Sequence, residues 1–185
     1  MRAMLPTMRS FVALSVLAAA TPALAGFTIE GKPKVTFNAE GSPGVLTFEG
    51  VTRELSLQDD GTNLVFSVPM DTVETGISLR DEHMRKTYVQ TDQFPDAILS
   101  VARDQISWPT DGSSEGTVQG RFTVHGVERG VTVTYSIKLT KSGYRVKASF
   151  PFDTSSHGVE IPSYLGVTIK PAMEAEVTVD LVDAT

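Results

Sequence analysis

The stretch GVTVTYSIKLT, residues 130–140, alternates apolar and polar side chains without a break. Successive side chains of a β-strand point to opposite faces, so the stretch predicts a strand with one buried face and one face in water. YRVKASFPF, residues 144–152, repeats the pattern after the turn at Lys141–Gly143. The two stretches together predict an antiparallel hairpin.

The same alternation continues outward in both directions, in runs bounded by Gly, Asp or Asn. These runs lie at residues 34–39, 44–50, 52–58, 63–70, 97–107, 116–126 and 173–181. With the hairpin they give about eight or nine strands and no strand–helix–strand rhythm, which favours an antiparallel sandwich or a closed barrel. Because no long amphipathic helix is available to cover an open sheet, the strands must cover one another. Eight strands closed on themselves leave an interior that side chains just fill, or that holds one small ligand.

The first 25 residues have the features of a secretory signal peptide. Arg2 and Arg9 precede the apolar run FVALSVLAAA, and Ala23-Leu24-Ala25 is an A-x-A cleavage signal. Ten apolar residues are half of the roughly 20 that span a bilayer, so we expect no stable membrane anchor. We therefore predict cleavage after Ala25, one mature domain at 26–185, and a periplasmic or secreted protein. The chain has no Cys, so the core alone must hold it together.

The charge balance argues against nucleic acid as a partner. The chain has 16 basic and 22 acidic side chains, and without Arg2 and Arg9 the mature domain has a net charge near −8. Such a surface keeps a secreted protein soluble and repels phosphate backbones.

The three histidines do not form a recognisable chemical site. His83 follows Asp81 and Glu82, but neighbouring residues on a helix diverge by about 100° and make no joint site. His125 and His157 are each followed by Gly, which indicates a turn, and no H-x-H or H-E-x-x-H spacing is present. There is also no G-x-S-x-G elbow, because the serines fall in loops or on solvent faces, and no Gly-rich loop opens a helix. We expect no enzyme, no metal and no cofactor.

Residues 77–97, ISLRDEHMRKTYVQTDQFPDA, interrupt the strands with a charged, helix-like stretch. Its R-D-x-H-M-R run, followed by the pair Phe94-Pro95 and then a strand, resembles the connector of the YceI-like family of secreted bacterial lipid-binding proteins. GRFTVHGVERGVTVTYSI, residues 120–137, is similar to that family's G-x-[LF]-T-[IV]-H-G-V-x-[KR]-x-V hairpin. Two motifs of the family are not evident: its opening, and its late R-S-D-F-G-type motif, which DTSSHGVEIPSYLG replaces.

The resemblance implies an all-β fold, an eight-stranded antiparallel lipocalin-like barrel with a short helical cap between strands. It also implies an interior that holds a long apolar chain of the isoprenoid or fatty-acyl type. Under this interpretation the charged stretch covers one end of the barrel. The cap and rim residues we expect are His83, Met84, Tyr88 and His125.

We therefore predict a carrier or binding protein for a long-chain apolar small molecule, with a homodimer left open. The inward parity of each strand gives the predicted lining residues, which are Phe48, Phe66, Val68, Phe122, Tyr135, Phe150, Phe152 and Val177. One alternative is a filled barrel that serves as a structural or protein-interaction module of the cell envelope. Another is an enzyme that brings Asp81, His83 and His125 together on folding.

Overall fold

The computed structural model describes residues 26–43, 46–164 and 166–184. These residues contain ten strands and five short helical segments, joined by turns and loops. The strands are β1 (Phe27–Ser42), β2 (Leu46–Thr52), β3 (Ser56–Asp59), β4 (Asn63–Pro69), β5 (Asp96–Ala102), β6 (Ser113–Val124), β7 (Val127–Leu139), β8 (Tyr144–Asp153), β9 (Ser163–Tyr164) and β10 (Val167–Asp183). The helical segments are η1 (Met70–Thr72), α1 (Ser78–His83), η2 (Met84–Tyr88), η3 (Arg103–Gln105) and η4 (Thr154–His157).

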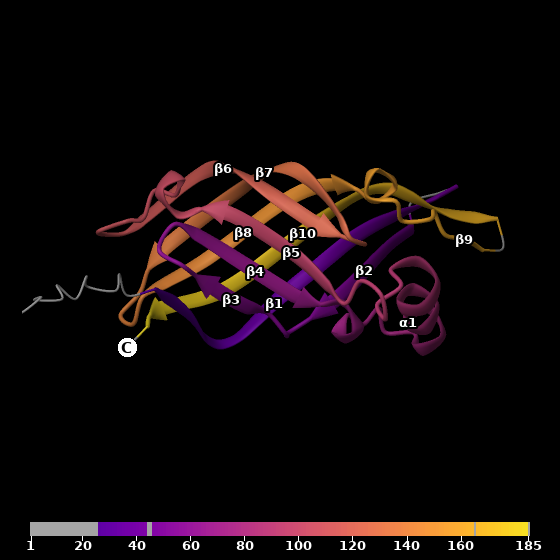
Figure 1. Ribbon diagram of the computed structural model, residues 1–185, viewed down its shortest axis with the longest axis horizontal. Coiled ribbons are helices and arrows are strands. Elements are labelled where there is room, and N and C mark those ends of the chain that lie inside the picture. The colour runs from indigo at the N-terminus through magenta and orange to yellow at the C-terminus, as the bar shows by residue number, and fades with distance from the viewer. Residues whose placement is uncertain (1–25, 44–45, 165, 185) are drawn as a thin grey trace, which may run out of the picture.

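The strands form one strongly curled antiparallel sheet in the order β2-β1-β10-β8-β7-β6-β5-β4-β3, with β9 paired to β10. Eight strands are long, while β3 and β9 have four and two residues. Figure 1 shows the sheet wrapping into an elongated barrel, with α1 at one end beside β2 and the C-terminus at the other. The expected all-β, lipocalin-like fold with a short helix between strands is confirmed.

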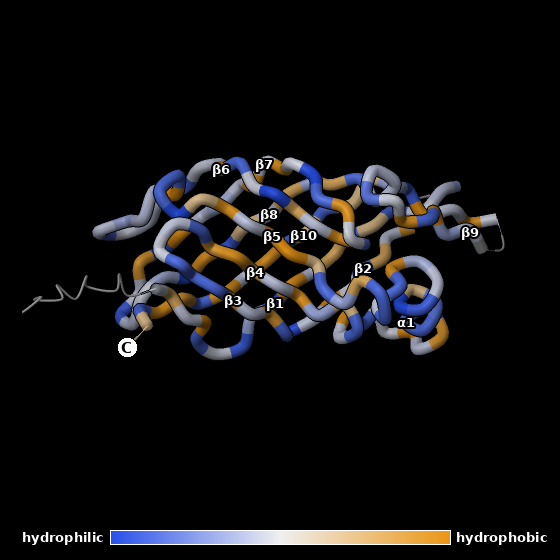
Figure 2. Tube along the Cα trace, viewed as in Figure 1, coloured by the Kyte–Doolittle hydropathy of each residue, from blue (hydrophilic) through white to orange (hydrophobic). Residues whose placement is uncertain are grey.

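The apolar residues of the alternating pattern lie in the core, and the polar residues between them face the surface. Along β7, Val131, Val133, Tyr135 and Ile137 are buried, and the residues between them are exposed or half-buried. Figure 2 shows hydrophobic and hydrophilic positions alternating along the strands. Because every strand turns its apolar face inward, the described residues have one continuous core, which runs along the barrel axis.

The sheet has a seam where its two ends, β3 and the β1–β2 pair, meet without a ladder of backbone hydrogen bonds. Near one end of the seam, the Phe27 backbone N–H donates to the carboxylate of Asp59 at 2.8 Å. Near the other end, Val51 and Glu74 exchange two backbone hydrogen bonds of 2.8 and 3.0 Å. A side-chain hydrogen bond and an isolated pair of backbone hydrogen bonds therefore join the two ends of the sheet where no continuous ladder does.

The first strand begins earlier than the sequence predicted. We expected a strand at 34–39, but β1 starts at Phe27 and pairs with β10 on both sides of a register shift between Glu30 and Lys34. Gly31 lies in that shift with φ of +73°. A bulge offsets the side-chain alternation by one position, which breaks the period-2 signal across one physical strand.

The predicted signal peptide, residues 1–25, lies outside the described residues. None of the helices in the described ranges is long and apolar enough to cross a membrane.

Candidate ligand cavity

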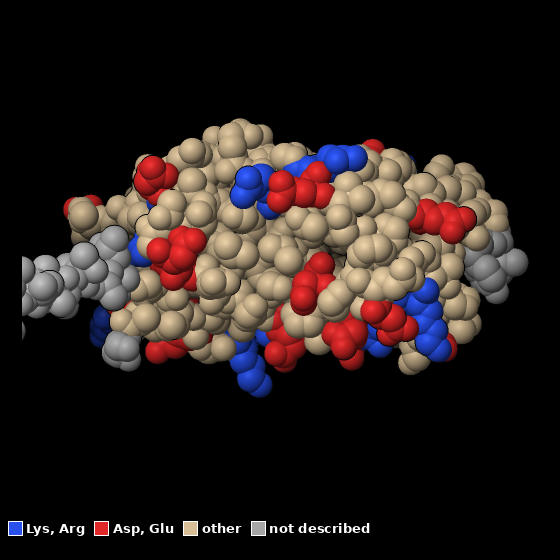
Figure 3. Space-filling model, viewed as in Figure 1, with Lys and Arg blue, Asp and Glu red and all other residues tan. Residues whose placement is uncertain are grey.

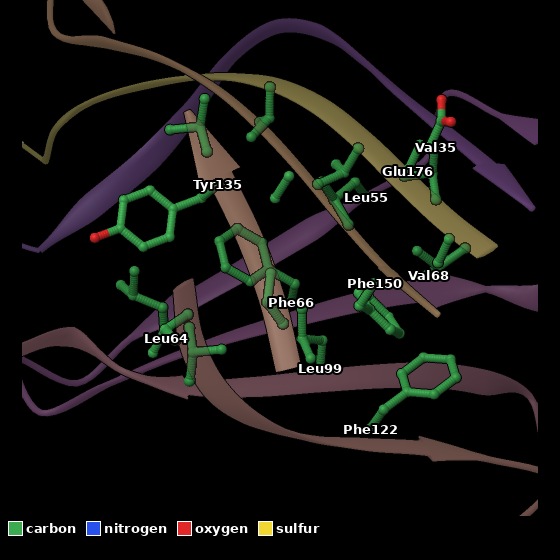
Figure 4. Close-up of a pocket in the computed structure, with 18 of the residues that line it drawn as sticks. Val35, Leu55, Leu64, Phe66, Val68, Leu99, Phe122, Tyr135, Phe150 and Glu176 are labelled. Atoms are coloured by element: carbon green, nitrogen blue, oxygen red, sulfur yellow. The ribbon is translucent and has the colours of Figure 1, made fainter. Parts of the chain in front are cut away.

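A narrow cavity of about 90 Å³ lies inside the barrel. Strands β1, β4, β5, β6, β7, β8 and β10 all contribute to its wall, with Leu55 from the segment before β3 and Ile106 and Trp108 from the segment after η3. Figure 4 shows side chains from these strands converging on a shared space, with Tyr135 toward one end and Phe122 and Phe150 toward the other.

The wall offers almost nothing to a polar ligand group. The Tyr135 hydroxyl accepts a hydrogen bond from the Ser107 backbone N–H at 3.0 Å, and Figure 4 shows it pointing away from the other labelled side chains. Glu176 is exposed, and its carboxylate also points away from the cavity. Because apolar atoms form the rest of the wall, the cavity suits a hydrocarbon and not a charged group.

Small side chains in the middle of the barrel account for the space. Strand register places the smaller side chains Ala148, Val177 and Val35 in one row across β8, β10 and β1, next to Tyr135 of β7. Ala97 and Ala175 add two more short side chains to the wall. Large side chains at these positions would meet across the axis and fill it.

Six of the eight predicted lining residues lie in the cavity wall. These are Phe66, Val68, Phe122, Tyr135, Phe150 and Val177. Phe48 and Phe152 do not line it. They belong with Met173 and Ala39 to one row across β8, β10, β1 and β2, which lies beyond the row that contains Phe150. Their position along the barrel axis puts them outside the cavity.

The cap consists of α1 and η2, and charged side chains fasten it to the barrel. Asp81, only 8% exposed, accepts hydrogen bonds from the backbone N–H of Thr75 at 2.8 Å and from its hydroxyl. Arg80 donates to the carbonyl of Thr75 at 2.5 Å, and Arg85 donates to the carbonyl of Val73 at 2.9 Å. The guanidinium of Arg80 also lies over the ring of Phe48, 5.3 Å from its centroid.

These contacts show what the R-D-x-H-M-R run does in the fold. Its two arginines and its aspartate hold the segment between η1 and α1, and that segment carries the bridge from Glu74 to β2. Sequence reasoning concentrated on the histidine of this run and missed the role of Arg80, Asp81 and Arg85. The available sequence signal was the clustering of oppositely charged side chains in this run, a few residues after Thr75.

The predicted cap and rim residues have different surroundings. His83 is exposed on α1, while Met84 and Tyr88 are half-buried on η2, with Met84 packed against the core. His125 occupies the two-residue turn between β6 and β7 with φ of +52°, followed by Gly126 at +71°. Two successive positive φ values are typical of a type I′ hairpin turn, which gives His125 a structural role.

His157 connects this turn to η4. The residue is 1% exposed, and its Nδ1 lies 2.8 Å from the carbonyl oxygen of Val127. Its own carbonyl lies 3.3 Å from Nδ1 of His125. Over the described ranges, no three His, Asp or Glu side chains gather as a metal site requires, so Asp81, His83 and His125 do not appear there as a joint centre.

A second hollow lies outside the barrel at the seam. It measures about 590 Å³ and is lined mostly by polar and charged residues at the end of β2, in the segment that follows β2, and around Thr72 and Glu74. Thr52 and Thr72 meet there, with their hydroxyl oxygens 2.7 Å apart. This hollow is open to water and lacks the apolar wall of the interior cavity.

Most charged side chains lie on the outside of the barrel. Figure 3 shows acidic and basic side chains interspersed over the visible face, with acidic groups following its lower edge. The most regular pair is Arg145 with Asp180, which forms two hydrogen bonds of 2.7 and 2.8 Å. This hydrogen bonding, with the positive charge of Arg145, lowers the pKa of Asp180 from its usual 3.8.

Comparisons with known proteins agree on the family and the fold. The YceI-like domain family matches residues 58–182, more than half of the chain. A polyisoprenoid binding domain from Saccharophagus degradans, implicated in plant cell wall breakdown, has a similar structure. Its TM-score is 0.69 at 11% identity, and the match covers 87% of this chain and 99% of that one.

Two further solved structures share the fold. Burkholderia cenocepacia BcnA has a TM-score of 0.62 at 14% identity, covering 78% of this chain and 94% of its own. A Campylobacter jejuni YceI protein has a TM-score of 0.53 at 14% identity, covering 94% and 99%. No protein with a curated description matches the sequence. The match to the family over residues 58–182 shows that this chain belongs to the YceI-like family.

Proposed function

We propose that this protein binds a slim hydrophobic chain molecule of isoprenoid or fatty-acyl type inside its barrel, and carries out no covalent chemistry. The observation that carries the proposal is the interior cavity, whose wall is apolar along its whole length. Burial of each CH₂ of a ligand contributes about 0.8 kcal/mol, so a hydrocarbon can bind there with hardly any polar contact.

The comparisons support the class of ligand. A structural relative is described as a polyisoprenoid binding domain, and it covers 87% of this chain. We propose further that the chain is exported to the periplasm, with residues 1–25 as the leader and residues 26–185 as the binding domain. The proposed ligand contacts are the six predicted residues that line the cavity, Phe66, Val68, Phe122, Tyr135, Phe150 and Val177.

The width of the cavity restricts the shape of the ligand. Sites for drug-sized molecules measure about 300–1,000 Å³, and this cavity is well below that range at about 90 Å³. A bound molecule must therefore be thin, or the half-buried wall side chains Phe66 and Leu99 must move to admit it.

The test is uptake of a fluorescent long-chain fatty acid by protein that has been stripped of lipid with organic solvent. Ala148 lies in the wall of the cavity, so Ala148→Phe places a ring in its middle and is expected to abolish uptake. Overpacking costs about 1–3 kcal/mol, so the smaller Ala148→Leu serves as a second variant with a graded effect. Ala172→Phe makes the same change at an exposed position of β10 and should bind like the wild type.

The narrowness of the cavity favours one alternative, a filled barrel that acts as a structural or interaction module of the envelope. That function predicts no lipid in the solvent extract, as read by mass spectrometry, and no uptake of the probe by any variant. Lipid in the extract together with loss of uptake in Ala148→Phe would exclude it.

A further inference from the structure

The cavity ends against a cluster of aromatic rings, which we call the aromatic stop and define as Phe122, Phe150, Phe152 and His157. The ring centroids of Phe122 and Phe150 are 4.9 Å apart, and those of Phe122 and Phe152 are 5.0 Å apart. The ring of His157 lies 5.6 Å from that of Phe122 at an interplanar angle of 76°. These are the edge-to-face contacts that hold aromatic rings in place.

Only the front of the aromatic stop contacts the cavity. Phe122 and Phe150 line it, whereas Phe152 and His157 lie behind them. Phe122, Phe150 and His157 are 3%, 6% and 1% exposed, and Phe152 is half-buried. The hydrogen-bond contact of His157 with the Val127 carbonyl, at 2.8 Å, ties the back of the stop to β7.

Strand register makes the stop two rows deep. Phe150, Ala175 and Phe37 form one row across β8, β10 and β1, and Phe152, Met173 and Ala39 form the next. The rows are two residues apart, or about 7 Å along a strand. The ring centroids of Phe37 and Phe152 are 6.4 Å apart, so the second row packs against the first.

Aromatic side chains also line the opposite end of the cavity. Trp108 lies in the wall, with its ring 4.7 Å from that of Phe27 and 5.1 Å from that of Tyr144. The wall runs from Val146 to Phe150 on β8, about 13 Å of strand, and from Ala175 to Leu181 on β10, about 20 Å. The apolar space is therefore bounded in length as well as in width.

We propose that the aromatic stop sets the maximum length of hydrocarbon chain that the barrel accepts, with Phe122 as the residue that fixes the limit. The favoured ligand is then a slim chain whose polar head group remains outside the apolar space, because the wall has no free polar group to receive it. The inference rests on the proposed function, since it concerns the same cavity. It adds that Phe122 is the side chain that selects among hydrocarbon ligands, and that it selects them by chain length.

The experiment is a length series of straight-chain fatty acids, from six to eighteen carbons, titrated into lipid-free protein. In the wild type each added methylene should tighten binding about fourfold until the chain reaches Phe122, after which added length should bring no gain. Phe122→Ala should move this limit to longer chains. Phe122→Leu, which keeps most of the buried volume, should move it by less and remains informative where Phe122→Ala fails to fold.

Phe66→Ala is the matched control, because Phe66 lines the cavity but lies outside the stop. It should change the affinity for all lengths alike and leave the limit in place. Wild-type affinity that keeps rising through the longest chain would overturn the inference and leave the proposed function standing. An unchanged limit in both Phe122 variants would do the same. Failure of every chain to bind the wild type would instead remove the proposed function, and the inference with it.

Discussion

The carboxylate of Asp59 and the backbone N–H of Phe27 form a 2.8 Å hydrogen bond across the seam between β3 and β1. The Asp59 side chain is 1% exposed and also lies 2.9 Å from a guanidinium nitrogen of Arg103. The guanidinium carbon of Arg103 is in turn 4.3 Å from the centroid of the Phe27 ring. One buried carboxylate thus joins the two ends of the sheet at the end of the barrel far from the cap.

Asp59→Ala should lower the free energy of unfolding by about 3–5 kcal/mol, because it leaves Arg103 without its buried partner and Phe27 without an acceptor. Urea denaturation measures the loss. Asp59→Asn keeps an acceptor for Phe27 but no charge for Arg103, so its loss should be smaller. The exposed pair of Glu40 with Lys170 is the control, and Glu40→Gln should leave the midpoint nearly unchanged. Equal losses in Asp59→Ala and Glu40→Gln would contradict the assigned role of Asp59.

Asp81→Ala should loosen the cap while the strands remain folded. The change removes the acceptor of two hydrogen bonds from Thr75, and hydrogen bonds to a charged group contribute about 1.5–3 kcal/mol. Amide hydrogen exchange across residues 78–88 should accelerate about ten- to a hundredfold for that free-energy change. Glu82→Ala, next to it on the exposed face of α1, should leave exchange in the cap close to wild type. Faster exchange throughout the barrel would mean that Asp81 supports the whole fold instead.

The fold class followed from the sequence because period-2 alternation is a local signal. GVTVTYSIKLT contains its own inward and outward faces, and β7 places Val131, Val133 and Tyr135 as that alternation requires. The start of β1 was missed because the register shift near Gly31 offsets the alternation inside one strand. A pattern read along a single segment cannot follow a strand through a bulge.

The extent of the cavity could not be predicted for a different reason. Parity decides whether a side chain points inward. By parity alone, Phe48 and Phe152 cannot be distinguished from the inward-facing residues that line the cavity. Their place along the axis depends on the register of β1, β2, β8 and β10, and the pairing of β1 with β10 joins residues more than a hundred positions apart. Such a register is a property of the folded sheet, and no local pattern in one strand contains it.

Arg145→Met should weaken the protein at neutral pH and have almost no effect in strong acid. Hydrogen bonding to Arg145 lowers the pKa of Asp180 below 3.8, so the ionised carboxylate is favoured in the folded state. The stabilisation is therefore present above about pH 4 and is lost as the pH falls through the folded pKa. Thermal melts of both proteins at pH 7 and pH 2 measure the change.

Both side chains of this pair are substantially exposed, so the difference in Tm should be small and should shrink at high salt. Arg121→Met is the comparison, since Arg121 lies 3.6 Å from Glu128 in a looser contact. The difference in Tm between wild type and Arg121→Met should vary less with pH. A difference for Arg145→Met that persists at pH 2 would point to packing by the arginine stem instead of its charge.

Gly126→Ala should destabilise the protein more than an equivalent change at another turn glycine. Gly126 has φ of +71°, and an added Cβ would lie 2.6 Å from Cε1 of Phe94, whose ring packs on His125 at a centroid distance of 4.5 Å. Gly112 has φ of +58° with nothing within 4 Å of an added Cβ, so Gly112→Ala carries the backbone strain alone. That strain costs about 1–3 kcal/mol, and urea denaturation of the two variants isolates the additional cost of moving Phe94. Equal losses would mean that the Phe94 ring shifts freely, and that the H-G pair of the hairpin motif is required by turn geometry alone.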